Sequence, residues 1–178
     1  MEAMVKKLQA KFRKVREELN EWETLQSRLI SQFMNASHII DRLQMLQSSK
    51  SYGDLNCISG LREAVLAKQV QSLNNIFVSM KRTLEEFHSI VLSLEKAHRD
   101  GRQLVKGGSS QPKVKQLQQQ VGVKPTLTEC LDGLLFLHEI HHSDSSDLGA
   151  LQQLLVDQPN LPSEEGMEEL SVDQKSFN

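Results

Sequence analysis

The sequence has few of the residues that build compact enzymes or disulfide frameworks. Aromatic residues make up 4% of its 178 positions, with one Trp, one Tyr and six Phe, and it holds only two cysteines. A chain poor in aromatics and rich in Leu, Gln, Ser and Glu is more typical of long helices than of a sandwich, barrel or doubly wound sheet. The cysteines, Cys57 and Cys130, form no short paired motif, which favours a reduced intracellular protein.

The balance of charge and the hydropathy pattern exclude further classes of protein. Lys and Arg number 21 against 23 Asp and Glu, so a net charge of −2 gives no overall attraction to nucleic acid or anionic membrane. No apolar run is long enough for a transmembrane helix, and the N-terminal MEAMVKKLQAKF lacks the apolar core of a secretion signal. We therefore expect a non-enzymatic protein without cofactor or metal, located inside the cell in the nucleus, the cytoplasm or both.

Apolar residues instead recur in heptads along two long segments. With Val5 at position a, eleven of twelve a and d positions between residues 4 and 47 are apolar, and no Pro or Gly occurs before Gly53. A second register over residues 58–99 has nine apolar positions of ten. Because the intervening Ser48 to Asn56 stretch is short and polar, the two helices should fold back as an antiparallel hairpin.

One a position of the first helix is polar. Gln26 resembles the polar residue that sets register in coiled coils, and if residue i faces roughly 106 − i, it lies near Met80. A solvated position at a leaky seam is an equally good interpretation of Gln26.

Both apolar stripes are wider than a two-stranded seam requires. Extra apolar residues occupy the g and e positions beside each seam. A stripe of this width predicts a third helix and, beyond it, a surface for a protein partner. The residues that we assign to this partner interface are Trp22, Leu25, Gln26, Ile30, Ile39, Ile76 and Ile90.

The C-terminal part predicts shorter helices between mobile segments. Gly101 should end the second helix, and the basic, Gln-rich stretch 101–125 reads as a linker. Thr126 and Glu129 fit a capping box that starts a third helix. The HHSDSSD sequence should break that helix and let a short fourth one follow. We thus predict an all-α fold with a hairpin over 1–100, a linker over 101–125, two short helices over 126–158 and a disordered acidic tail over 159–178.

One motif suggests catalysis. His138, Glu139 and His142 satisfy the zinc-protease pattern His-Glu-x-x-His, in which two His one helical turn apart bind the metal and Glu activates water. The residues that follow supply no third ligand, and no strand pattern is present to bind a substrate. A cluster of basic residues between Lys6 and Arg16 could contact phosphates, but acids follow at once, so we do not expect direct nucleic-acid binding.

Several short matches carry a family resemblance. The sequence resembles the CINP family (cyclin-dependent-kinase-two-interacting proteins) at Trp22, Glu23, Thr24, Leu25, Asn35, Asp147, Leu148, Leu151, Leu155, Gln158 and Pro159. It also resembles the AIRIM family of ribosome maturation factors, our second choice, at Lys7, Phe12, Val15, Glu17, Glu18, Trp22, Leu61, Lys68, Gln69 and in the helix after Pro125.

The resemblance implies a non-catalytic adaptor or scaffold subunit of an AAA+ ATPase complex. Such a complex acts in maturation of the large ribosomal subunit and in DNA replication or genome maintenance. The implied partners are a related helical subunit, the ATPase and, through CINP, a cyclin-dependent kinase of the cell cycle. Two alternatives remain open: a coiled-coil structural subunit of an unrelated assembly, and a zinc metalloenzyme that uses His138, Glu139 and His142.

Overall fold

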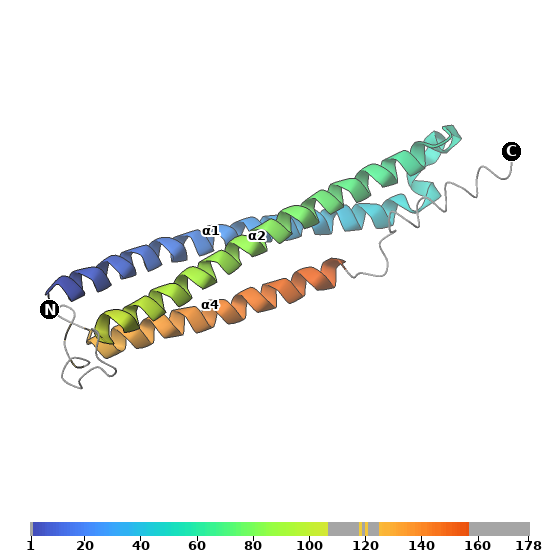
Figure 1. Cartoon of the computed structure of the whole chain (residues 1–178). Helices are drawn as coiled ribbons and strands as arrows, with labels where there is room; N and C mark the ends of the chain where they lie inside the picture. Colours follow the sequence, from blue (N-terminus) through green and yellow to red (C-terminus); the bar gives the residue numbers. More distant parts are fainter. Residues whose placement is uncertain (1, 107–117, 119, 121–124, 157–178) are drawn as a thin grey trace. The chain divides into compact units, whose positions relative to one another are not determined.

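The computed structural model describes residues 2–106, 118, 120 and 125–156 of the chain. Its elements are α1 (Glu2–Leu46), the 3-10 helix η1 (Ser49–Cys57), α2 (Leu61–Lys106) and α4 (Leu127–Val156), of which α1 and α2 run antiparallel (Figure 1). These residues contain no strand, only an isolated bridge between Gln120 and Thr126. The all-α prediction is confirmed. None of the described helices is both long and apolar enough to cross a membrane.

The chain divides into two compact units, and α1, α2 and α4 each contribute to both. Unit 1 comprises Met1–Ser27 and Leu84–Ala150, and unit 2 comprises Arg28–Thr83 and Leu151–Asn178. Each unit has its own buried apolar residues, as expected from heptads that continue along the whole of both long helices.

Unit 1 is a three-helix arrangement. Its buried residues come from all three helices: Leu8, Val15, Trp22 and Leu25 of α1; Phe87, Ile90, Val91, Leu94 and Val105 of α2; and Leu127, Cys130 and Leu134 of α4. A third helix therefore packs on the hairpin, as the width of the apolar stripes predicts.

The core of unit 2 is built mainly by the other halves of α1 and α2. Ala36, Ile40 and Leu43 of α1 pack with Val70 and Leu73 of α2. Near the end of α4, Gln152 Nε2 donates to the Phe77 carbonyl at 3.2 Å.

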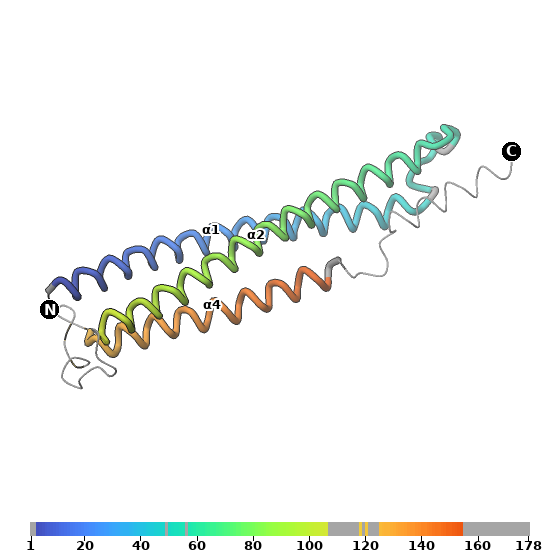
Figure 2. Tube along the Cα trace, viewed as in Figure 1, coloured from blue at the N-terminus to red at the C-terminus, as the bar shows by residue number. Residues whose placement is uncertain are grey.

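The connection between α1 and α2 folds into the 3-10 helix η1, which Figure 2 shows as a compact turn. Gly53 and Gly60 have φ of 48° and 78°, in the left-handed region that glycine adopts without strain. Arg62 Nη2 closes the turn by donating to the Gln47 carbonyl at 2.6 Å.

This turn shifts the pairing of the two helices from the predicted register. Four side-chain hydrogen bonds between α1 and α2, two in each unit, join residues whose numbers add to 111, rather than roughly 106. The pairs are Lys11–Asp100, Glu18–Ser93, Gln32–Ser79 and Arg42–Gln69. The expected register was wrong because α2 begins at Leu61, after the whole of η1, and not at Ile58.

Two predicted helix ends were also wrong. Gly101 lies inside α2, which continues to Lys106 because Val105 still adds to the buried core of unit 1. The HHSDSSD sequence does not break α4, which is one helix to Val156. Ser and Asp are only moderately poor helix formers, and Ser146 Oγ returns a hydrogen bond to the His142 carbonyl at 3.2 Å. Residues 107–117, 119 and 121–124 of the predicted linker and the whole acidic tail lie outside the described residues.

The predicted capping box is confirmed at the start of α4. The Thr126 backbone N–H donates to Glu129 Oε2 at 2.7 Å, and the Glu129 N–H donates to Thr126 Oγ1 at 3.3 Å. The Thr126 hydroxyl also donates to Glu129 Oε2, at 2.9 Å, and the two bonds that the ionised carboxylate accepts lower the pKa of Glu129. The start of this helix is therefore fixed by local sequence, although its path along the hairpin is not.

Candidate protein-binding groove

An open groove of about 740 Å³ lies in unit 1. One wall comes from α1 and the other from the first part of α4 and from Pro125, two positions before that helix. The lining residues are Gln9, Phe12, Arg13, Val15, Arg16, Leu19, Pro125, Cys130 and Leu137. We call this feature the α1/α4 groove.

Helical spacing explains why these α1 residues share one wall. Phe12, Val15 and Leu19 follow one another at intervals of three and four residues and so fall on the same face. Val15 is buried, whereas Phe12 and Leu19 are only half-buried and leave apolar surface in the groove. The α1 wall of the groove is therefore apolar and accessible.

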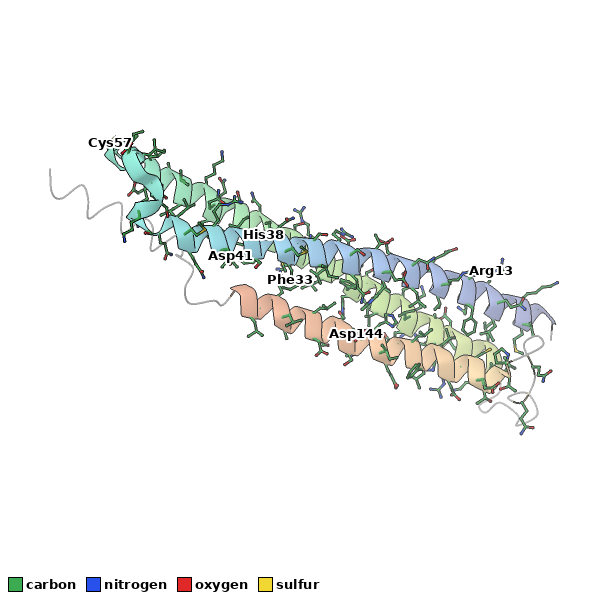
Figure 3. All side chains as sticks on the ribbon, turned by 180° about the vertical axis from the view of Figure 1, so that it is seen from behind. Arg13, Phe33, His38, Asp41, Cys57 and Asp144 are labelled. Atoms are coloured by element: carbon green, nitrogen blue, oxygen red, sulfur yellow. The ribbon has the colours of Figure 1, made fainter. Side chains whose placement is uncertain are left out.

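Two arginines give the groove a positive rim. Arg13 and Arg16 are exposed, and neither forms an ion pair with any residue in the described part of the chain. Figure 3 shows Arg13 projecting from α1. By contrast, Lys11 Nζ lies 2.8 Å from Asp100 Oδ2, and this hydrogen bond lowers the pKa of Asp100. Lys14, the neighbour of Arg13, has its Nζ 3.7 Å from Glu18 Oε1. The groove thus combines apolar contact area with guanidinium groups available to an anionic ligand.

Within unit 1, which contains the groove, Trp22 stabilises the position of α4. Its ring packs edge-on against Phe87 of α2 and His141 of α4, with centroids 4.5 Å away in both cases. His141 Nδ1 lies 2.7 Å from the Leu137 carbonyl, a contact that orients the imidazole. Trp22 is 4% exposed, so it is part of the core of unit 1 and not a residue that reaches a partner in this structure.

The structure separates the other residues of the predicted partner interface into three groups. Leu25 and Ile90 are buried at 0% and 4% exposure in the core of unit 1, so neither is open to a partner in this structure. Ile39 and Ile76 pack, partly buried, against the core of unit 2. Only Gln26 and Ile30 are exposed. The surplus apolar residues at g positions are mostly used inside the protein, because the helices bury a wider stripe than the a and d seam.

Gln26 is therefore not the polar residue that sets the pairing. In unit 2, Gln32 Nε2 donates to Ser79 Oγ at 2.8 Å, and the fully buried Thr83 hydroxyl lies 3.2 Å from Gln32 Oε1. The sequence pattern missed this cluster because Gln32 and Thr83 are at g positions. These positions become internal only when the helices bury the wider stripe.

The zinc-protease motif lies on consecutive turns of α4. The rings of His138 and His142 are 5.8 Å apart, and Glu139 is exposed. Among residues 2–106 and 125–156 no three His, Cys, Asp or Glu side chains are grouped to hold a metal. Burial lowers the pKa of the nearby His98, and the charges of Arg102 and His138 lower it further.

Sequence reasoning missed the groove, although it noted most of its residues. Phe12 and Leu19 are a positions of the predicted hairpin seam, and Arg13 and Arg16 belong to the basic cluster for which we expect no nucleic-acid binding. The available signal was the alternation of these arginines with apolar a positions. The other wall, with Leu137, depends on where α4 lies and has no local signal in α1.

The comparisons with known proteins agree with one of the two resemblances. A family model described as "CA109-like: Ribosome biogenesis protein C1orf109-like" matches residues 2–173. The chain belongs to this family. The match supports the AIRIM resemblance, our second choice, whereas CINP, our first choice, finds no support in it. Comparisons with curated proteins and with solved structures gave no significant match.

The residues of the CINP resemblance have mostly ordinary surface positions in this C1orf109-like protein. Thr24 Oγ1 donates to the Asn20 carbonyl at 3.1 Å within α1. Leu148 is half-buried, and Gln158 and Pro159 lie outside the described residues. The remaining exposed positions are Glu23, Asn35, Asp147 and Leu151. Trp22 and Leu25 are the two residues of this set that are buried, and an apolar side chain suits that position.

Proposed function

We propose that this ribosome biogenesis protein is a non-catalytic helical adaptor whose α1/α4 groove binds a segment of a partner protein. The observation that supports the proposal is the combination of an accessible apolar wall at Phe12 and Leu19 with Arg13 and Arg16 at the rim. Grooves on helical proteins recognise amphipathic segments through such apolar contacts, and arginine is enriched in protein interfaces. The expected ligand is a segment with apolar anchors and acidic neighbours.

The partners that we propose follow from the AIRIM resemblance. They are an AAA+ ATPase of large ribosomal subunit maturation and a related helical subunit that pairs with this chain. A role inside the cell, in the nucleus, the cytoplasm or both, is part of the same proposal. The links to DNA replication and to a cyclin-dependent kinase come from the CINP resemblance alone.

Affinity purification of variants from native cells tests the groove. Arg13→Glu/Arg16→Glu changes two exposed side chains, so the fold should persist while association with the ATPase falls about tenfold or more, as expected for loss of interface arginines. Lys81→Glu/Arg82→Glu makes the same charge change at exposed positions of α2 in unit 2 and is the matched control. Quantitative mass spectrometry of co-purified proteins gives the readout. Equal recovery with both double variants would contradict the groove as the docking site.

A separate variant tests the exposed residue that remains from the sequence-based interface. Ile30 is 60% exposed in unit 2, so Ile30→Asp should leave the helicity unchanged. Loss of the partner with Ile30→Asp, but not with the arginine variant, would move the interface to unit 2. Retention of the partner would remove Ile30 from the site.

The metalloenzyme alternative makes an opposite prediction. Glu139→Gln removes the carboxylate that would activate a zinc-bound water. In an adaptor this change should leave complementation of ribosome maturation intact. Stoichiometric zinc in protein purified without chelator, together with loss of complementation by Glu139→Gln, would contradict the non-catalytic assignment.

A further inference from the structure

The pairing of α1 with α2 brings two basic segments of unit 1 together. Residues 3–16 of α1 contain six Lys and Arg and no acid, and residues 96–106 of α2 contain four Lys and Arg. The single acid of the two segments is Asp100, and its bond to Lys11 shows that they lie side by side. This end of unit 1 is therefore strongly positive, although the net charge of the chain is −2.

On α2 the cations form a row that faces solvent. Arg99, Arg102 and Lys106 are exposed and follow one another at intervals of three and four residues, so they share one side of the helix. Together with His98 and Gln103 they line a hollow of about 290 Å³. Each of these lining side chains carries an N–H donor, and none of them is acidic. We call Arg99, Arg102 and Lys106 the α2 basic row.

The charges of this row are available to a ligand. Arg102 and Lys106 form no ion pair with any residue in the described part of the chain. Arg99 Nη1 lies 3.7 Å from Glu95 Oε1 in an exposed pair one helical turn apart. Such pairs are weak in water, so Arg99 can exchange this partner for a stronger anion.

Two acids at the beginning of α4 leave the row in excess of positive charge. Glu129 accepts the hydrogen bonds of the capping box from Thr126. Asp132 lines a second hollow, of about 310 Å³, between α2 and α4 together with Arg102 and Lys106. It is not within ion-pair distance of either cation among the described contacts.

The chemistry of the row favours a strand of phosphates over a protein segment. The α1/α4 groove has an apolar wall, whereas the described lining of the hollow beside the row consists of polar side chains alone. Guanidinium and ammonium groups form strong charge-assisted bonds with phosphate oxygens. Arg102 and Lys106 lie one helical turn apart, about 6 Å along the axis, so they can contact successive phosphates of one strand.

We propose that the α2 basic row binds the phosphate backbone of RNA. The chain belongs to a ribosome biogenesis family, and the particles on which such proteins act consist largely of RNA. Among the described lining residues of the two hollows there is no Phe, Tyr or Trp on which a base could stack. The contact should therefore be independent of base sequence.

This inference goes beyond the proposed function and requires no partner protein. None of the three residues of the row lines the α1/α4 groove. The expectation of no nucleic-acid binding was based on the basic residues of α1, which acids follow directly in the sequence. The antiparallel pairing, and not the local sequence, adds the basic segment of α2 to the same end of unit 1.

Fluorescence anisotropy of the full-length chain with a labelled single-stranded RNA of about twelve nucleotides tests the contact. Titrations at several salt concentrations give the logarithm of the association constant against the logarithm of the salt concentration. Three phosphate contacts predict a slope of about −2, because each contact on a single strand contributes about −0.7. RNAs of different base composition should bind within about twofold of one another.

Matched neutralising variants locate the binding surface. Arg102→Gln/Lys106→Gln should weaken RNA binding about tenfold or more at low salt and make the slope shallower by about 1.4. Lys81→Gln/Arg82→Gln makes the same charge change at exposed positions of α2 in unit 2 and should leave the affinity within about twofold. Circular dichroism of each chain verifies that the helices are intact.

Several results would overturn the proposal. They are the absence of RNA binding at low salt, a slope near zero, and equal weakening by the two variants, which would show attraction to positive charge in general. Competition by polyglutamate that equals competition by unlabelled RNA at the same charge would assign the row to an acidic protein segment. Tighter binding of single-stranded DNA than of RNA, by more than about threefold, would contradict RNA as the ligand.

The proposed function and this contact can fail separately. The groove is tested by recovery of a partner protein with Arg13→Glu/Arg16→Glu, whereas the row is tested by RNA affinity of the purified chain. Loss of RNA binding in Arg102→Gln/Lys106→Gln with unchanged recovery of the partner would support the row as a second, independent surface of unit 1.

Discussion

Replacing Trp22 with alanine should destabilise unit 1 more than any other single truncation in α1. A buried Trp side chain covers about 150–250 Å², and Trp22 is 4% exposed, so nearly all of this area leaves water on folding. At about 25 cal/mol/Å² the lost burial corresponds to about 4–6 kcal/mol as an upper estimate, and measured Trp→Ala losses are about 3–5 kcal/mol. Because the ring contacts both α2 and α4, we expect α4 to detach first.

Urea unfolding followed by circular dichroism gives the free energy of unfolding of Trp22→Ala. The neighbouring Glu23→Ala, at an exposed position, is the matched control and should stay within about 0.5 kcal/mol. Hydrogen exchange then reports whether amides of α4 lose protection before those of α1. A loss for Trp22→Ala below about 1 kcal/mol would refute the core assignment and return Trp22 to the partner interface that the sequence suggested.

The edge-on contact with His141 can be separated from burial by a double-mutant cycle. Trp22→Ala and His141→Ala should couple by about 0.5–1.5 kcal/mol, the usual range for an aromatic pair. Additive effects would show that Trp22 stabilises α4 only through general burial.

Three further predictions concern stability. Gly101→Val should cost about 1–3 kcal/mol by urea unfolding, because a Cβ there would lie 3.1 Å from Leu131 Cδ2, whereas Gly133→Ala, with open space around it, should be neutral or stabilising. Because the folded protein lowers the pKa of His98, the unfolded chain binds a proton at this residue more readily than the folded chain does. The free energy of unfolding is therefore unaffected above the unfolded pKa of about 6.5 and decreases as the pH falls below that value. His98→Asn should flatten this acid limb when the free energy of unfolding is measured against pH. Thr126→Ala should cost about 1 kcal/mol and speed hydrogen exchange at the start of α4, and unchanged exchange would contradict its role as a cap.

Local patterns were sufficient to predict several elements correctly. The capping box at Thr126 and Glu129 depends on four consecutive residues, and its two hydrogen bonds are present as expected. The helix signals near Gly101 and HHSDSSD failed for the opposite reason. A glycine or a polar run is a weak local stop signal. Beyond Gly101 the buried Val105 favours continuation of the helix, and beyond HHSDSSD the half-buried Leu148 and the Gln152 hydrogen bond to the Phe77 carbonyl lie on the continued helix.

The amino-acid sequence by itself determined that this chain forms long helices with wide apolar stripes, because the 3.6-residue period places those side chains on one side whatever lies beside them. Only the tertiary structure decided which part of each stripe is covered. Leu25 and Ile90 are buried in unit 1, whereas Phe12 and Leu19 remain partly open beside Arg13 and Arg16. The path of α4 makes this difference, and it depends on contacts between residues more than a hundred positions apart, such as Trp22 with His141, which no periodicity within α1 encodes.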